Sequence, residues 1–212
     1  MGIMMSATIP KSNTKTLLSW GFYDWANSSF SSIIETFVLP AYFVKAVVGN
    51  EELGTEQWGL VLGITGFIIA LGGPILGAIA DQAGHRKGWL FSFTLLNVIA
   101  CALMWFIYPD AGSAIFALAL FSIATIGSEF AYVFYNAMLP DIVEPSKIGR
   151  WSGWGWGLGY VGGMLSLVVA LFLFIDPNLS PFNFDRSQSE DVRASLVLVA
   201  GWYGLFSIPI FL

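Results

Sequence analysis

The sequence predicts an all-α membrane protein built from six transmembrane helices, and two observations support that prediction. The first is composition: of the 212 residues, 56% are hydrophobic and only 11% are charged, whereas a soluble domain carries about 25% charged residues. One compact core cannot take up that much apolar surface, and water would not tolerate the remainder. The second is a set of long runs with few charges or none, which match the roughly 20 residues needed to cross a bilayer. We therefore expect the lipid bilayer to surround this chain.

Six stretches of sequence meet the length requirement for a membrane-spanning helix. Four of them carry no charged residue, while the first contains Asp24 and Glu35 and the fourth contains Glu129. None shows the period-two alternation of a barrel strand. After a tail of residues 1–16, the predicted spans are 17–44, 57–80, 88–109, 113–139, 151–175 and 195–212.

Rare residue types exclude several classes of site. A single cysteine, Cys101, and a single histidine, His85, cannot form a disulfide framework or most thiolate and histidine metal centres. We expect no metal and no cofactor. The formal net charge of −5 offers no basic surface for nucleic acid, so nucleic acid is not an expected partner. Residues 1–16 lack the apolar run and cleavage site of a signal peptide.

Loop charges predict the orientation, because cytoplasmic loops are enriched in lysine and arginine. If the chain begins inside, six basic residues fall in inner segments and three in outer segments. The inner set is Lys11, Lys15, Arg86, Lys87, Lys147 and Arg150, and the outer set is Lys45, Arg186 and Arg193. We expect a multi-pass integral membrane protein with both ends in the cytoplasm, and a bacterial inner membrane as its location.

Polar residues form one stripe on the first predicted span and another on the fourth. The members recur mostly three or four positions apart, which places each stripe within an arc of about 100° on its helix. Neither stripe could face lipid, so we predict that both line a common water-filled cavity. The first stripe is Asp24, Asn27, Ser28, Ser31 and Glu35, and the second is Ser122, Thr125, Glu129, Tyr132 and Asn136.

The three carboxylates carry most of this prediction. Serine and threonine often do no more than hydrogen-bond between membrane helices, and that interpretation stays open for the hydroxyl residues. Asp24, Glu35 and Glu129 are costly to bury, and no lysine or arginine lies at a comparable depth. We expect at least one of them to be protonated at rest, because desolvation favours the neutral form. Such a cavity suits protons and small cationic or zwitterionic solutes.

Glycines mark the second and fifth spans as closely packed helices. The second has small-xxx-small pairs at Gly59/Gly63 and Gly73/Gly77, and the fifth has six glycines between positions 153 and 163. Small residues let membrane helices approach one another. The third and sixth spans carry few polar residues or glycines, so we expect them to be peripheral.

The loop between the second and third spans resembles a known signature. Gly77, Asp81, Gly84, Arg86 and Lys87 match the cytoplasmic loop of the major facilitator superfamily, while Gln82 and His85 replace basic residues of that motif. The resemblance implies a twelve-helix transporter fold, of which this chain is the N-terminal half. It also implies that the acid and the arginine gate the inner side through a charge network.

Three further segments resemble the vacuole-effluxer-like branch, relatives of the vacuolar amino-acid effluxer of autophagy. They are Tyr23–Ser28, Tyr135–Asp141 and Ile148–Gly153. The resemblance implies a secondary active transporter that moves a small polar solute, plausibly amino acids, by alternating access with proton coupling and in the direction of efflux. The abrupt end at Leu212 suggests truncation before a second six-helix domain, so the expected partner is that missing C-terminal half or another copy of the chain.

Two other classes of function stay open. A non-transporting membrane assembly or sensor subunit would not need the buried carboxylates. An intramembrane serine hydrolase built on Ser152 would need a base within hydrogen-bond reach, and His85, the one histidine of the sequence, lies in a distant loop. We therefore expect that the chain is not an enzyme.

Overall fold

The computed structural model describes residues 13–82 and 84–212, and within those ranges it contains helices and no strand. The first span runs from Thr14 to Val48, and six helices in the described ranges are long and apolar enough to cross a membrane. The predicted all-α, six-span fold class is therefore confirmed. The first 12 residues of the expected tail, Lys11 among them, lie outside the described part. The α-helices are α1 (Thr14–Ser29), α2 (Leu39–Tyr42), α3 (Glu51–Gln82), α4 (Arg86–Leu103), α5 (Ala114–Ile142), α6 (Ile148–Ala170) and α7 (Glu190–Phe211).

The first span is not a regular α-helix along its whole length. Between α1 and α2 it widens into π-helical turns over Phe30–Phe37, and it does so again over Phe43–Val48. In the first wide segment the amide of Val38 donates to the carbonyl of Ile33, five residues earlier. The spacing of side chains around this helix therefore changes halfway through the membrane.

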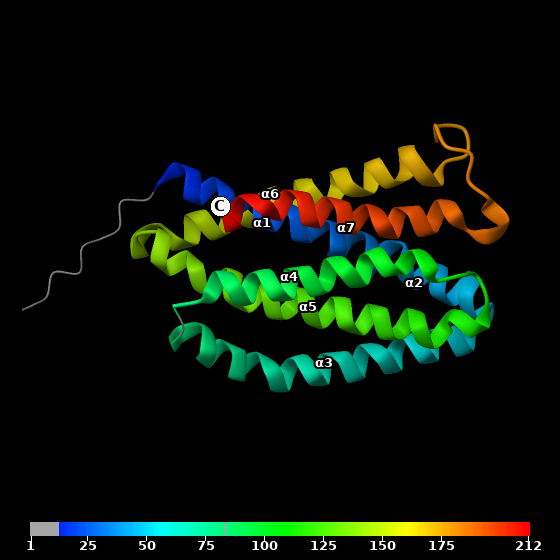
Figure 1. Ribbon diagram of the computed structural model, residues 1–212, viewed down its shortest axis with the longest axis horizontal. Helices are drawn as coiled ribbons and strands as arrows, with labels where there is room; N and C mark the ends of the chain where they lie inside the picture. Colours follow the sequence, from blue (N-terminus) through cyan, green and yellow to red (C-terminus); the bar gives the residue numbers. More distant parts are fainter. Residues whose placement is uncertain (1–12, 83) are drawn as a thin grey trace, which may run out of the picture.

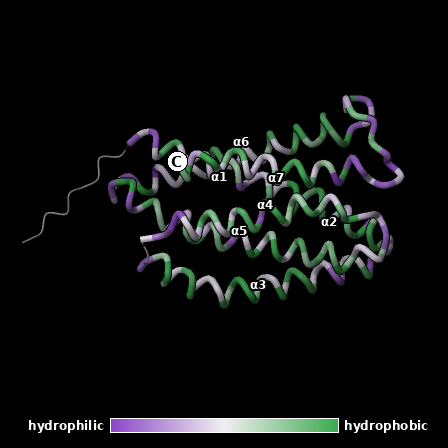
Figure 2. Tube along the Cα trace, viewed as in Figure 1, coloured by the Kyte–Doolittle hydropathy of each residue, from purple (hydrophilic) through white to green (hydrophobic). Residues whose placement is uncertain are grey.

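Most helices begin or end outside the charge-free stretches of the sequence. For example, α3 begins at Glu51, with two acids in its first turn, because negative charges are favourable beside the partial positive charge of a helix N-terminus. Hydropathy colouring shows the result, with hydrophilic residues gathered at both ends of the bundle and apolar ones between (Figure 2). Charge gaps thus mark the apolar centre of a helix, while its polar ends lie beyond them.

The helices form two groups that meet along the middle of the molecule. In one group α1 packs against α6 and α7, in the other α5 packs against α3 and α4, and a contact between α4 and α7 joins the two (Figure 1). The start of α1, the α3–α4 turn, the α5–α6 turn and the C-terminus lie at one end of the bundle (Figure 1). We call this the Arg86 end.

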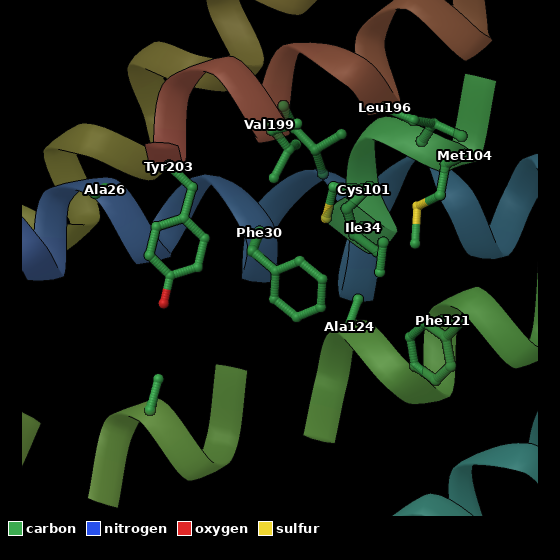
Figure 3. Packing of buried hydrophobic residues seen from close by; sticks show 14 of the residues in the cluster. Ala26, Phe30, Ile34, Cys101, Met104, Phe121, Ala124, Leu196, Val199 and Tyr203 are labelled. Carbon is green, nitrogen blue, oxygen red and sulfur yellow. The ribbon is translucent and has the colours of Figure 1, made fainter. Parts of the chain in front are cut away.

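The core lies where the first span, α4, α5 and α7 meet. Phe30 of the first span, Phe121 of α5 and Tyr203 of α7 are among its buried side chains (Figure 3). One hydroxyl network crosses it, because the Tyr23 hydroxyl lies 2.7 Å from the Thr94 hydroxyl and 2.7 Å from the Tyr203 hydroxyl. These hydrogen bonds join α1, α4 and α7. They are favourable because buried hydroxyl groups inside a membrane protein cannot bind water in their place.

Two expectations about packing were wrong. The third and sixth spans, α4 and α7, are not peripheral. Within an apolar stretch of 18 residues, 33% of α4 and 39% of α7 is buried in the bundle, against 6% for the second span, α3. The glycine pairs of α3 are also open, since a Cβ on Gly59, Gly63, Gly73 or Gly77 would meet nothing within 4 Å. Composition misled here because lipid and a neighbouring helix are both apolar, so hydropathy does not tell one from the other.

The end opposite Arg86 is held by a buried arginine. Arg193, in the first turns of α7, is 2% exposed and lies over the rings of Trp105 and Tyr108, with its Cζ 4.8 and 4.5 Å from their centroids. Its Nη1 also donates to the Trp105 carbonyl at 2.8 Å. Cation–π contacts and the hydrogen bond together fix the start of α7 against the end of α4.

Candidate functional site

A cavity of about 540 Å³ lies between the first span, α5 and α6. Six of the residues expected to line a common cavity do line it. They are Asp24, Asn27, Ser28, Ser31, Glu129 and Tyr132. The carboxylates of two separate spans therefore face the same hollow. Since Glu129, Trp156 and Tyr160 are exposed, the cavity opens at the surface of the bundle.

Glycines of α6 bring the polar face of α1 to this site. A Cβ on Gly159 would lie 2.7 Å from the Ser28 hydroxyl, and a Cβ on Gly163 would lie 2.5 Å from the Ser32 hydroxyl. A larger residue at either position would force these serine side chains to move, and at Gly163 its Cβ would also lie 3.1 Å from the Ser28 carbonyl oxygen. The close packing predicted for the fifth span is thus present at the level of the cavity.

Two hydrogen bonds between α1 and α5 hold the cavity walls together. The Tyr132 hydroxyl donates to Oδ1 of Asp24 at 3.1 Å, and the Ser128 hydroxyl donates to Oδ1 of Asn27 at 2.8 Å. Asp24 is 5% exposed, while Glu129 is exposed at the mouth. The lining contains two acids and neither lysine nor arginine, so the site is electrostatically negative whenever the acids are ionised. It offers carboxylate and hydroxyl oxygens to a ligand that donates hydrogen bonds or carries positive charge.

The structure places Glu35 outside the lining, although its spacing from Ser31 predicted otherwise. The reason is the wide π-helical segment, in which a residue stacks on the one five positions earlier. The Thr36 hydroxyl donates to the carbonyl of Ser31 at 2.8 Å, and Thr36 lines the cavity where Glu35 was expected. Glu35 is half-buried beside it.

Three residues of the α5 stripe also lie elsewhere. Ser122 accepts a hydrogen bond from the Thr65 hydroxyl of α3 at 2.9 Å, so it joins two helices and does not line the cavity. Thr125 is buried, and its hydroxyl has no hydrogen-bond partner among residues 13–82 and 84–212. Asn136 is exposed near the end of α5. The interhelical interpretation therefore holds for Ser122, whereas Thr125 and Asn136 neither line the cavity nor form a side-chain hydrogen bond within the described residues.

Several lining residues were missed by the sequence reasoning. Ser32 and Thr36 fell outside the stripe because of the π-helical turns. The aromatic wall formed by Trp156 and Tyr160, whose rings stack edge to face with centroids 4.8 Å apart, lies on a helix noted for its glycines. Its signal was present: two aromatic residues four positions apart share one helix face.

The α3–α4 turn forms a second polar site at the Arg86 end, with a hollow of about 490 Å³. Asp81, Gly84, Arg86 and Lys87 line it, as do Gln82, Met138, Asp141 and Ile142, whereas Gly77 does not. Arg86 forms an ion pair with Asp141 of α5. It also donates to the carbonyls of Ala80 at 2.5 Å and Ala137 at 2.9 Å.

Asp141 is thus the acid paired with the loop arginine, and the sequence analysis had not singled it out as a gating residue. It lies in one of the three quoted segments, directly after the apolar part of the fourth span. Arg86 joins the ends of α3 and α5 through one side chain. No group of three or more potential metal ligands occurs in the part of the chain that the structure describes.

Six membrane-spanning helices with an acidic cavity open on one flank define a multi-pass membrane protein. The sequence profile of the Major Facilitator Superfamily matches residues 9–167. The chain belongs to that family, and its bundle has the fold of the N-terminal six-helix half. Members of that family are secondary transporters.

Three relatives extend the comparison. The chain is 31% identical to the uncharacterized MFS-type transporter YxiO of Bacillus subtilis, over 92% of this chain and 46% of that protein. It is 26% identical to an uncharacterized protein of Aquifex aeolicus, over 77% of this chain and 40% of the relative. It is 24% identical to autophagy-related protein 22 of Eremothecium gossypii, over 82% of this chain and 34% of that protein. The chain therefore spans less than half the length of these curated relatives. No solved structure matches it.

Proposed function

We propose that this bundle forms one half of a secondary active transporter that moves a small polar solute by alternating access, coupled to protons. The observation that carries the proposal is the shared cavity, in which Asp24 of the first span and Glu129 of α5 face one hollow without a basic residue in its lining. Intramembrane acids facing a cavity are the usual elements of proton and substrate pathways. Amino acids are the solute class we propose, since their ammonium groups suit the carboxylates.

The likeness to autophagy-related protein 22 and the three quoted segments support assignment to the vacuole-effluxer-like branch and transport in the direction of efflux. A bacterial inner membrane with both chain ends in the cytoplasm agrees with the loop charges. Among described residues, Lys15, Arg86, Lys87, Lys147 and Arg150 belong to segments at the Arg86 end, whereas Lys45, Arg186 and Arg193 belong to segments at the other end.

A partner completes the proposed carrier. Alternating access requires two halves that rock about a central site, and we propose that a second six-helix half supplies the other wall. The open cavity and the exposed glycine face of α3 support this, as does the greater length of the relatives. A second copy of the chain taking that place is the alternative outcome of an assembly experiment.

The experiment is proton-driven amino-acid uptake into proteoliposomes that contain the chain together with its second half. We expect Asp24→Asn and Glu129→Gln each to lower uptake by roughly tenfold or more, which corresponds to about 1.4 kcal/mol. Glu56→Gln is the matched control, because it removes the same charge from an exposed position on α3. Uptake that is unchanged in both cavity variants would contradict the proposal.

A further inference from the structure

A third hollow lies between the first turns of α1 and α6, apart from the acidic cavity and from the hollow at the α3–α4 turn. Its volume is about 380 Å³. All but one of its lining residues are apolar, aromatic or glycine, and three of them are tryptophans. The lining is Leu17, Leu18, Trp20, Gly21, Arg150, Trp151, Trp154, Gly155 and Leu158. We call this hollow the Trp154 groove.

The Trp154 groove opens on the opposite flank of α6 from the cavity. On this helix Arg150, Trp154 and Leu158 line the groove, whereas Trp156 and Tyr160 line the cavity. At 100° per residue, Trp154 and Trp156 point about 200° apart. Since Gly155 and Gly159 pack against α1 between these two flanks, the groove faces outward.

The groove has a polar mouth and an apolar floor. Arg150 lies in the first turn of α6, which begins at Ile148, and Leu158 lies about 12 Å deeper at 1.5 Å per residue. Because α6 spans the membrane, its first turn lies at the bilayer surface and the floor lies at hydrocarbon depth. Tryptophan is enriched in that interfacial layer. The shape fits an amphiphile with its polar group at the surface.

Positive charge gathers at the mouth. Arg150 is exposed and forms no ion pair within residues 13–82 and 84–212. Neither α1 nor α6 has an acidic residue in its first turn, and Lys147 provides no side-chain cap to α6. Because Lys147 is paired with Glu144, the positive charge at the mouth comes from the Arg150 guanidinium and from the partial charge of the α6 N-terminus.

We propose that the Trp154 groove binds an anionic glycerophospholipid. The lipid phosphate would accept hydrogen bonds from Arg150 and from the first amides of α6, as arginine and helix N-termini bind phosphate elsewhere. One acyl chain would lie along Leu18, Trp154 and Leu158. Basic pockets between transmembrane helices are known binding places for anionic headgroups. A free phosphate would use the mouth alone and leave the apolar floor empty.

The test is native mass spectrometry of the delipidated full chain, titrated separately with phosphatidylglycerol and phosphatidylcholine. We expect one saturating phosphatidylglycerol adduct and weak retention of phosphatidylcholine. Arg150→Gln should weaken phosphatidylglycerol binding about tenfold and remove the selectivity, whereas Arg150→Lys should keep part of it. Lys45→Gln, which removes an exposed charge at the other end of the bundle, should change nothing.

A second pair of variants tests the acyl-chain floor. Trp154→Ala should weaken the adduct, and Trp156→Ala is its matched control: the two side chains are similarly exposed, at 61% and 63%, but on opposite flanks. Equal retention of the two lipids would overturn the proposal. So would an Arg150→Gln variant without effect, displacement of the lipid by excess inorganic phosphate, or a Trp156→Ala effect equal to that of Trp154→Ala. The proposal would also be overturned if, in the lipid-free chain, a photo-crosslinking residue placed at position 154 reacted with residues 1–12 or with a second copy of the chain.

Discussion

Gly162 allows the closest approach between α6 and the backbone of the first span. A Cβ at this position would lie 2.6 Å from the carbonyl oxygen of Trp25 and 3.0 Å from its Cα, and backbone atoms cannot move aside as a flexible side chain can. We predict that Gly162→Ala destabilises the bundle by about 1–3 kcal/mol, the usual cost of overpacking. The measurement is unfolding of the purified chain in detergent.

Gly157→Ala is the control for this prediction. It lies on the same helix, and a Cβ there would meet nothing within 4 Å. We expect it to be neutral or to stabilise the helix by up to about 1 kcal/mol. Equal destabilisation by both changes would show that helix approach is not the cause.

Asp185, in the loop before α7, gives a prediction about pH. The hydroxyl and amide of Ser187 donate to its Oδ1 at 2.6 and 2.9 Å, and these bonds hold the pKa of the Asp185 carboxyl below its usual value of 3.8. A lowered pKa in the folded protein contributes stability above that value, and the contribution is lost as the pH falls through the folded-state pKa.

We therefore predict that the Ser187 amide is protected from hydrogen exchange at neutral pH and loses that protection in acid. Asp185→Asn should lower the protection at neutral pH and remove the acid step. Glu190, which accepts a hydrogen bond from the Asp185 amide, is unchanged in this variant, so an acid step that persists would assign the effect to Glu190 instead.

At this scale the sequence predicted the main cavity acids and missed others for a physical reason. A constant 100° per residue brings Asp24 and Glu129 to one hollow, as the structure has them. The same arithmetic fails at Glu35, because the backbone changes from α-helical to π-helical turns at Phe30. The spacing of polar residues in the sequence does not predict this change from α-helical to π-helical turns.

Among the elements, the α3–α4 turn depends most on a single side chain. Arg86 reaches Ala80 at the end of α3 and both Ala137 and Asp141 on α5. We predict that Arg86→Gln raises the exchange rates of amides around this turn by roughly tenfold or more, since charge-assisted hydrogen bonds contribute about 1.5–3 kcal/mol. Hydrogen exchange measured by mass spectrometry checks this.

Lys87→Gln provides the comparison. It removes a neighbouring charge from the same turn, and Lys87 forms no ion pair among the residues that the structure describes. Exchange there should stay within about twofold of the wild type, because exposed charges contribute little. If both variants loosen the turn equally, net charge and not the Arg86 contacts holds it.

The number of helices follows from the sequence, whereas their packing order does not. Long runs with few charged residues or none indicate segments that cross the bilayer, and all six spans were predicted in that way. Burial within the bundle depends on how side chains fit together, so the glycines of α3 wrongly predicted close packing. Asn97 of α4 is buried and donates to the Ala124 carbonyl at 2.8 Å, but its position in the sequence did not predict that contact. Polar groups that only join helices cannot be told by sequence from those that bind solutes.

At the scale of the whole molecule, α3 presents a nearly unpacked face. We predict that Gly63→Leu leaves the unfolding temperature of this chain unchanged, because nothing lies within 4 Å of a Cβ there. In the proposed carrier, where a second half covers that face, the same change should abolish association and amino-acid uptake. Lowered stability of the chain by itself would contradict the first part, and normal uptake would contradict the second.

Arg193 has a consequence for how the bundle can move. Its guanidinium is held by two aromatic rings and a carbonyl at one end of the α4–α7 contact, while Phe91 and Phe211 stack edge to face, with centroids 5.4 Å apart, at the other. Sliding α7 along its axis would lift the charge off both rings, and lysine could not replace the flat stacking surface of the guanidinium. Contacts at both ends of their interface therefore constrain α4 and α7 to move together.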